Sequence, residues 1–391
     1  MSRSEGFSLV GGGLLRAFRR RLRLSGDVLD WTRWRVLVTV AFAWVPLLLL
    51  SIAEGRAWGG NVALPFLRDV ETQARMLIAI PLFILAENTF HRQLAPIVRC
   101  FVDDGLVPEA ARARFDAAVA SATRLRNSVL AELLLLALVY VVGILIVRRT
   151  QFALGVDTWY ASAGSGIQRL TPAGWWGAFV SMPIVQFLAV RWYFRFFVWA
   201  RFQWQVSRIE LDLKPTHPDG TAGLHFVSLA EHACRPVMLA LGVLLSAMIA
   251  NKILYAGATL FDFKVEVVGT VALLVLMVLG PMLAFTPQLI VAKHRGIEHY
   301  GRLGQQYARE FEQKWVGGDR QAGEPLLGSA DIQSLADLHN GSKVIRDMRV
   351  APFDLKNVGV LTLVTLAPCV PLVLTVFSIE EIVDRLLKTI F

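Results

Sequence analysis

The sequence is poor in the residues on which several protein classes depend. It has only three cysteines, Cys100, Cys234 and Cys369, too few and too widely spaced for a disulfide framework. It contains no CxxC or HExxH motif, no phosphate-binding P-loop and no repeated histidine box. Charged residues make up 18% of the chain, against about a quarter in soluble domains. These shortages exclude a disulfide-rich secreted protein and give no signature of a standard metal- or nucleotide-dependent enzyme.

Hydrophobic residues are abundant instead, at 55% of the chain, with a mean hydropathy of +0.51. Long apolar runs alternate with arginine-rich stretches, which predicts an all-α, polytopic membrane helical bundle. We expect seven spans, each approaching the ~20 apolar residues that cross the hydrocarbon core. The second is the shortest, because its apolar run ends at Glu87 and Asn88. The expected spans are 36–52, 76–90, 128–147, 175–199, 237–255, 265–292 and 358–377.

The distribution of lysine and arginine predicts the orientation of these spans. Segments 1–35, 91–126, 201–235 and 293–351 together carry 27 of these residues, and the connections on the opposite side carry 7. The positive-inside rule therefore puts the N-terminus in the cytoplasm, and seven spans put the C-terminus outside. The net charge of +9 is accounted for by arginines that flank spans, so we expect the lipid bilayer and not nucleic acid as the partner.

Three spans are expected to continue as helices into the cytoplasm, where they would form a helical layer. One helix would run from Pro108 into the third span, one from the fourth span to Pro215, and one from the sixth span to about residue 316. A helix of about 40 residues is about 60 Å long, twice the thickness of the hydrocarbon core. Such a layer offers a surface for a cytoplasmic protein partner.

The chain divides by composition into a basic amphipathic segment, 1–35, a six-span bundle, 36–316, a cytoplasmic helical insert, 317–351, and a last span with a short amphipathic tail, 352–391. In the insert, Ser329 is expected to cap a short helix that ends near Asn340 and Gly341, followed by a second short helix. Pro368 and Pro371 lie inside the last span. We expect them to kink it, the alternative being a re-entrant hairpin.

Polar residues inside or at the edge of spans are the first candidate site, because a lone charge within the bilayer costs several kcal/mol and needs a partner. Arg191 and Arg195 are four residues apart and share one helical face. They could anchor the cytoplasmic end of the span by snorkelling, or they could line an anion path with Glu87 as counter-charge. The candidate lining residues are Glu87, Asn88, Arg191, Arg195, Asn251 and Lys252.

A second candidate lies in the loop between the fourth and fifth spans, which concentrates metal-ligating residue types at His217, Asp219, His225, Glu231, His232 and Cys234. Their spacing matches no known zinc or iron motif, so we favour an ordinary polar loop over a metal site, and the sequence names no cofactor. Pro218, Asp219 and Gly220 form a turn signal, since proline fixes φ, aspartate bonds back to the backbone and glycine permits positive φ.

Two stretches, THPDGTAGL in this loop and EPLLGSADIQSLADL before the last span, carry a resemblance. They resemble a family of uncharacterised bacterial integral-membrane proteins with HPD-x-x-GGL and ADIQSLADL stretches, although Thr-Ala-Gly stands here where the family has Gly-Gly. The likeness covers the chain from about residue 200 onward. It implies a bacterial inner-membrane location and no particular activity. The span number and long cytoplasmic helices also resemble insect chemoreceptor channels, a likeness of architecture only.

Three functions follow as hypotheses. The first is a homo-oligomeric channel or transporter for a small ion or solute, based on the intramembrane charges. The second is a non-enzymatic scaffold or sensor that binds a partner through the cytoplasmic helices. The third, a metal-dependent membrane enzyme using the loop at 217–234, ranks last because the ligand spacing is missing.

Overall fold

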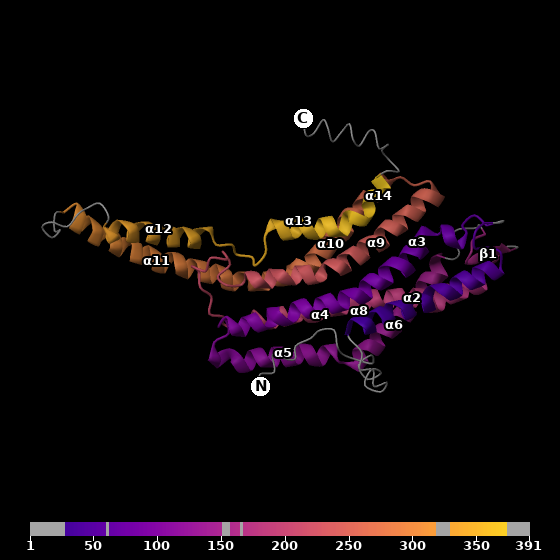
Figure 1. Ribbon diagram of the computed structural model, residues 1–391, viewed down its shortest axis with the longest axis horizontal. Helices are drawn as coiled ribbons and strands as arrows, with labels where there is room; N and C mark the ends of the chain where they lie inside the picture. The colour runs from indigo at the N-terminus through magenta and orange to yellow at the C-terminus, as the bar shows by residue number, and fades with distance from the viewer. Residues whose placement is uncertain (1–27, 60–61, 151–156, 165–166, 318–328, 374–391) are drawn as a thin grey trace, which may run out of the picture.

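The computed structural model describes residues 28–59, 62–150, 157–164, 167–317 and 329–373 (Figure 1). Within these ranges the protein is almost entirely helical, which confirms the expected all-α class. The strands β1 (Ala161–Gly164) and β2 (Ile167–Leu170) form one antiparallel hairpin, with Ala161 opposite Leu170. The expected amphipathic segment at the N-terminus and the C-terminal tail both lie largely outside the described residues.

The long helices are α2 (Val28–Ala53), α4 (Ile80–Asp103), α5 (Arg112–Arg126), α6 (Val129–Thr150), α8 (Met182–Val206), α9 (Ala230–Ala256), α10 (Lys264–Leu279), α11 (Thr286–Trp315), α12 (Ala330–Asp347) and α13 (Leu355–Leu366). Short helices α3 (Val70–Gln73), α7 (Pro172–Trp176) and α14 (Val370–Val373) continue or precede them. Two π-helical turns, Ala74–Ala79 and Gly177–Ser181, lead into α4 and α8.

Five helical stretches of the described chain are long and apolar enough to cross a membrane: Trp31–Ala53, Pro172–Val206, His225–Ala256, Leu260–Trp315 and Leu355–Val373. The pair Glu109–Arg126 and Val129–Gly143, bent by 46°, makes a sixth if it is one span. These helices fit a membrane-embedded protein. The second expected span lies in α4, which carries too many polar residues to qualify, so the seven-span count stays a prediction.

Helix α9 is the central element, packed between α4 on one side and α13 on the other (Figure 1). Its apolar and small residues are buried along most of its length. Gly242 allows the closest approach, because a Cβ there would lie 2.1 Å from the Thr365 carbonyl oxygen. One turn further along, Ser246 Oγ donates to the Pro368 carbonyl oxygen over 2.6 Å. Small residues on α9 therefore set the position of the last described span.

Two of the three expected helical extensions are wrong. The helix after Pro108 breaks at Asn127–Ser128, where the Ser128 side chain accepts the N–H of Ala131 and starts α6. Helix α8 ends at Val206 and continues through a turn at 207–209 into an irregular segment, and residues 207–215 together are called the strap here. The amide of Gln288 on α11 donates to the carbonyls of Ser207 and Ile209 over 2.6 and 2.7 Å and so holds the strap in place.

The third extension is confirmed as a helix, since α11 runs unbroken from Thr286 to Trp315, and its cytoplasmic location stays a prediction. With α12 packed antiparallel on it, α11 forms a hairpin that projects from the bundle (Figure 1). Ser329 caps α12 as expected by accepting the N–H of Asp331. The expected break at Asn340 and Gly341 is wrong, because α12 passes through both without interruption. After α13 the chain forms a 3-10 turn, Ala367–Cys369, and resumes as α14, beyond which it is not described.

Candidate functional site

A buried cluster of charges joins the helices of the bundle. Glu87 on α4 is at its centre, and its Oε1 accepts from Arg195 Nη2 over 2.8 Å and from Arg191 Nη1 over 3.3 Å, both on α8. Its Oε2 accepts from Arg35 Nη1 on α2 over 2.9 Å. The side chains of Glu87 and Arg195 are only 5% and 4% exposed. The two arginines thus reach Glu87 together, as their four-residue spacing predicts.

The cluster has a second acid, Glu132 on α6, whose Oε1 lies 3.7 Å from Arg191 Nη2. Three arginines and two glutamates from four helices give the cluster a formal charge of +1. Arg35 and Glu132 were not among the sequence candidates. The sequence could have indicated Glu132, because it is an acidic residue inside the third expected span. Arg35 could not be singled out, because it was counted among the basic residues that flank the first span.

The position of the cluster along α8 bears on the anchor interpretation of Arg191 and Arg195. Counted from Pro172, Arg195 lies roughly 35 Å along the helix axis, slightly more than the ~30 Å of the hydrocarbon core. Arg35 likewise lies one turn inside the start of its span at Trp31. The cluster is therefore near one end of the spans, but Arg191 and Arg195 are buried and paired and do not snorkel to solvent.

Beyond the cluster, α8 carries a buried polar stripe of Arg195, Trp199 and Gln203, which lie on one helical face at four-residue spacing. Arg195 Nη1, Trp199 Nε1 and both amide atoms of Gln203 have no hydrogen-bond partner among the described residues. The three residues are 4%, 3% and 1% exposed. The stripe is about 12 Å long at the rise of an α-helix. Its unpaired atoms comprise three donor groups and one acceptor.

The other predicted lining residues lie elsewhere. Asn88 is half-buried on α4. Asn251 Nδ2 donates to Asp69 Oδ1 over 2.7 Å, in a network where Trp159 Nε1 also donates to Asp69. Lys252 is exposed, with Nζ 5.2 Å from the centre of the Phe263 ring. The structure therefore brings together three of the six predicted residues and assigns Asn251 to a separate structural network.

The loop at 217–225 is a turn built around Asp219. Its carboxylate accepts the backbone N–H groups of Thr221, Gly223 and His225 over 2.8, 3.1 and 3.0 Å, and Gly220 has φ +67°. Partial burial raises the pKa of Asp219, but the hydrogen bonds from the backbone of Thr221, His225 and Gly223 outweigh it and hold the pKa at about 2. The predicted turn at Pro218–Gly220 agrees with this geometry.

The same turn is tied to the segment that precedes the last span. Arg349 donates from its backbone N to the Gly220 carbonyl over 2.8 Å and from Nη2 to the Asp219 carbonyl over 3.0 Å. Arg349 Nη1 also pairs with Asp354, the N-cap of α13, over 3.1 Å. The turn therefore positions the start of α13 through one arginine.

Of the remaining loop candidates, Glu231 and Cys234 are bonded within the protein, whereas Nδ1 of His225 and Nδ1 of His232 have no hydrogen-bond partner among the described residues. Glu231 is buried and pairs with Arg235 over 2.8 Å and with Asn357 over 3.2 Å. His232 Nδ1 lies 3.4 Å from Glu231, and the Cys234 thiol donates to the Ala230 carbonyl. Among the residues that the structure describes, no three His, Cys, Asp or Glu side chains are arranged to hold a metal ion.

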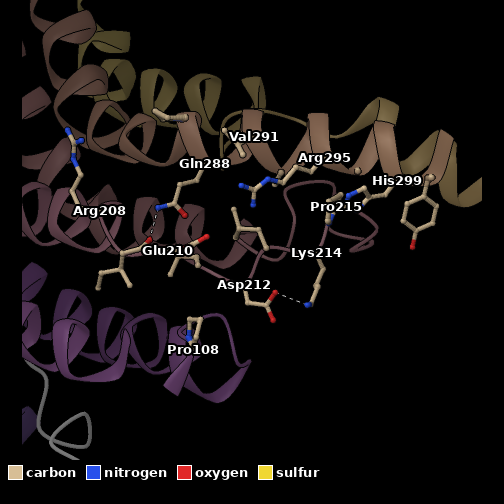
Figure 2. A pocket seen from close by; sticks show the side chains of 17 residues that line it. Pro108, Arg208, Glu210, Asp212, Lys214, Pro215, Gln288, Val291, Arg295 and His299 are labelled. Atoms are coloured by element: carbon tan, nitrogen blue, oxygen red, sulfur yellow. Dashed lines mark hydrogen bonds and ion pairs between the residues drawn. The ribbon is translucent and has the colours of Figure 1, made fainter. Parts of the chain in front are cut away.

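A cleft of about 830 Å³ opens between the strap and the first turns of α11, with Pro108 at its edge (Figure 2). Its charged lining residues are Arg208, Glu210, Asp212, Lys214 and Arg295. The sequence does not predict this cleft, because residues 207–213 have the composition of a helix. Contacts with distant residues, among them Gln288 on α11 and the Leu106 carbonyl, hold the strap instead.

Comparison of this chain with protein-family models, with curated proteins and with solved structures finds no match. The site must therefore be interpreted from its own chemistry.

Proposed function

We propose that this protein is a membrane transport protein that passes a small inorganic anion along α8. The observation that carries the proposal is the stripe of Arg195, Trp199 and Gln203, in which Arg195 Nη1, Trp199 Nε1 and both Gln203 amide atoms are buried without partners in the described protein. Buried donors are almost always hydrogen-bonded, and leaving one unsatisfied costs about 1–3 kcal/mol. A stripe with several such donors fits a series of binding positions for a mobile ligand at the end of the spans where the cluster lies.

The chemistry of the stripe favours an anion over a cation. A guanidinium N–H, an indole N–H and an amide NH₂ all donate, and only the amide oxygen of Gln203 accepts. The adjoining cluster carries a formal charge of +1, which attracts a negative ligand in surroundings of low dielectric. Glu87 keeps the arginines from binding the anion too tightly for release, because it neutralises part of their charge.

The proposal includes a bacterial inner membrane, a cytoplasmic N-terminus and a homo-oligomeric state. The asymmetry of 27 against 7 basic residues supports the orientation. The resemblance of the THPDGTAGL and ADIQSLADL stretches supports the location. Large apolar side chains exposed on α10 and α13, such as Val265 and Leu363, leave ample surface for lipid or for further copies of the chain.

Chloride and nitrate flux from liposomes containing the full-length protein tests this function. Trp199→Phe keeps the ring but removes the N–H, and we expect flux to fall about fivefold, as for the loss of one hydrogen bond of about 1 kcal/mol. Gln203→Leu should act in the same direction. Trp204→Phe is the matched control, because Trp204 lies on the same helix but is 53% exposed. Absence of anion flux through the wild-type protein, or equal flux in both tryptophan variants, would overturn the proposal.

A second candidate function is a scaffold, favoured by the projecting hairpin of α11 and α12. Of the 30 residues of α11, only Leu289 and Gly296 are fully buried, and Ile332 and Leu335 on α12 remain 42% and 36% exposed. The exposed apolar pair suits contact with a second copy. Ile332→Ser with Leu335→Ser should then lower the oligomeric state measured by light scattering in detergent. An unchanged mass would count against the hairpin as the interface.

A further inference from the structure

The cleft between the strap and α11 has the size and the charges of a ligand site. Its volume of about 830 Å³ falls within the roughly 300–1,000 Å³ of small-molecule sites. The strap forms one wall and is fixed by the Gln288 amide, so the wall keeps its shape. Residues 287–300 of α11 form the other wall, from which Arg295 reaches toward the strap (Figure 2).

The basic side chains of the cleft differ in whether a neighbouring carboxylate neutralises their charge. Lys214 Nζ pairs with Asp212 over 2.7 Å, so the two charges cancel. Neither Arg208 nor Arg295 forms an ion pair with a carboxylate in the described part of the chain. The Arg208 guanidinium lies 5.3 Å from the centre of the exposed Trp204 ring, which orients it without neutralising it. Arg295 is therefore free to bind an anion in bidentate fashion, and Arg208, which lies at the other end of the cleft, adds positive charge (Figure 2).

The cleft also lies where the chain changes from apolar to polar. Exposed Leu276 on α10 and Leu283 in the following 3-10 turn precede it, and residues from Lys293 onward are mostly polar. An exposed tryptophan, Trp204, stands at the same level, and such residues concentrate at the boundary between hydrocarbon and headgroups. Val291 and Ala292 supply an apolar lining beside Arg295. A ligand with a charged head and an apolar tail fits this gradient.

We propose that the cleft binds the phosphate of an anionic phospholipid headgroup, held by Arg295 and attracted by the additional charge of Arg208, with the acyl chains directed toward the apolar end of α11. Basic pockets at the ends of membrane helices bind phospholipid headgroups by this chemistry. A free phosphate ion presents the same oxygens, so the source of the phosphate is decided by experiment. The proposal stands apart from anion passage along α8, since it uses none of Arg195, Trp199 and Gln203.

Calorimetric titration of the full-length protein in neutral detergent tests the site. The probes are dioctanoyl phosphatidylglycerol, dioctanoyl phosphatidylcholine and inorganic phosphate. We expect phosphatidylglycerol to bind more tightly than phosphatidylcholine, and Arg295→Gln or Arg208→Gln each to raise its Kd about fivefold, the value of one basic residue near an anionic surface. Arg309→Gln is the matched control, exposed on α11 about 21 Å further along the helix.

The outcomes separate the alternatives. Tight binding of inorganic phosphate with the same arginine dependence supports the phosphate site and assigns it to a soluble source. Equal Kd values of Arg295→Gln and Arg309→Gln for phosphatidylglycerol would overturn the site. Binding of phosphatidylcholine as tight as that of phosphatidylglycerol would overturn it as well. An unchanged melting temperature in both variants shows that a loss of binding is not a loss of folding.

Discussion

Arg195 and Glu87 lie 108 positions apart in the sequence and meet at 2.8 Å in the interior of the helix bundle. Neither charge would be tolerated there alone, because desolvating an ion costs several kcal/mol unless a partner compensates for it. The pair therefore fixes how α4 and α8 face each other. It also places Arg195 Nη1 at the start of the polar stripe.

Removal of the central acid should be strongly destabilising. Glu87→Gln leaves Arg35, Arg191 and Arg195 near one another with Glu132 as the only acid of the cluster. We expect a loss of about 3 kcal/mol, the usual cost of removing one member of a buried ion pair. Thermal unfolding in detergent, followed by tryptophan fluorescence, measures it.

The control for this substitution is Glu71→Gln, because Glu71 pairs with Arg75 in a half-buried pair of neighbouring turns. Its loss should cost about 0.5 kcal/mol. If both variants melt at the wild-type temperature, the buried cluster does not hold the bundle together.

Contact between the hairpin and the strap depends on Gly296. A Cβ at this position would lie 2.7 Å from Pro215 Cβ and 3.0 Å from Ile345 Cγ2, so Gly296→Ala forces the strap or α12 to move. We expect destabilisation by about 1–3 kcal/mol and faster proteolysis of the strap. Gly301→Ala on the same helix meets nothing within 4 Å and should stabilise α11 by up to about 1 kcal/mol. The prediction requires the free energy of unfolding to fall in Gly296→Ala and to rise in Gly301→Ala.

The packing of α9 against α13 can be tested in the same way. Gly242→Ala would bring a Cβ to 2.1 Å from the Thr365 carbonyl oxygen, which belongs to backbone and cannot rotate away. We expect the two helices to separate and the melting temperature to fall. Gly269→Ala on α10 has open space within 4 Å and is the control. A Gly242→Ala protein as stable as the control would mean that the helices are not this close.

Acid should weaken the turn at Asp219. Folding lowers the pKa of this carboxyl from 3.8 to about 2, so its ionised form stabilises the folded state. That contribution is complete above about pH 4 and is lost as the pH falls toward 2. Asp219→Asn should lower the melting temperature at pH 7 and flatten its decline between pH 4 and pH 2. An equally steep decline in the variant would assign the acid sensitivity to other groups.

Local signals in the sequence predicted the elements that depend on neighbouring residues. The apolar runs indicated the membrane helices, Ser329 indicated the start of α12, and Pro218–Gly220 indicated the turn. These local signals failed where contacts with residues distant in the sequence determine the structure. Residues 207–213 have the composition of a helix, yet the helix ends at Val206, and contacts with Gln288 and Leu106 hold the residues that follow in an irregular path. Asn340 and Gly341 read as a helix end, yet packing on α11 keeps α12 intact.

The candidate site was predictable in part for the same reason. Arg191 and Arg195 share a face by spacing alone, and Glu87 was the natural counter-charge. That Arg35 and Glu132 complete the cluster, and that Asn251 instead bonds to Asp69, depends on how four helices meet in space. Trp199 and Gln203 have unpaired polar atoms because both side chains are buried. The sequence does not predict burial at an arginine-rich end of a span.

The bond between Arg349 and Asp219 has a consequence for biosynthesis, because it closes a contact over 130 positions of the chain. At about 5–20 residues per second, roughly 7–26 s separate the synthesis of the two residues. Throughout that interval the carbonyl groups of Asp219 and Gly220 lack their Arg349 donors, and α13, which follows Arg349 in the chain, is not yet synthesised. The final membrane helix of the described chain is thus docked late, after the α8–α9 connection has already formed.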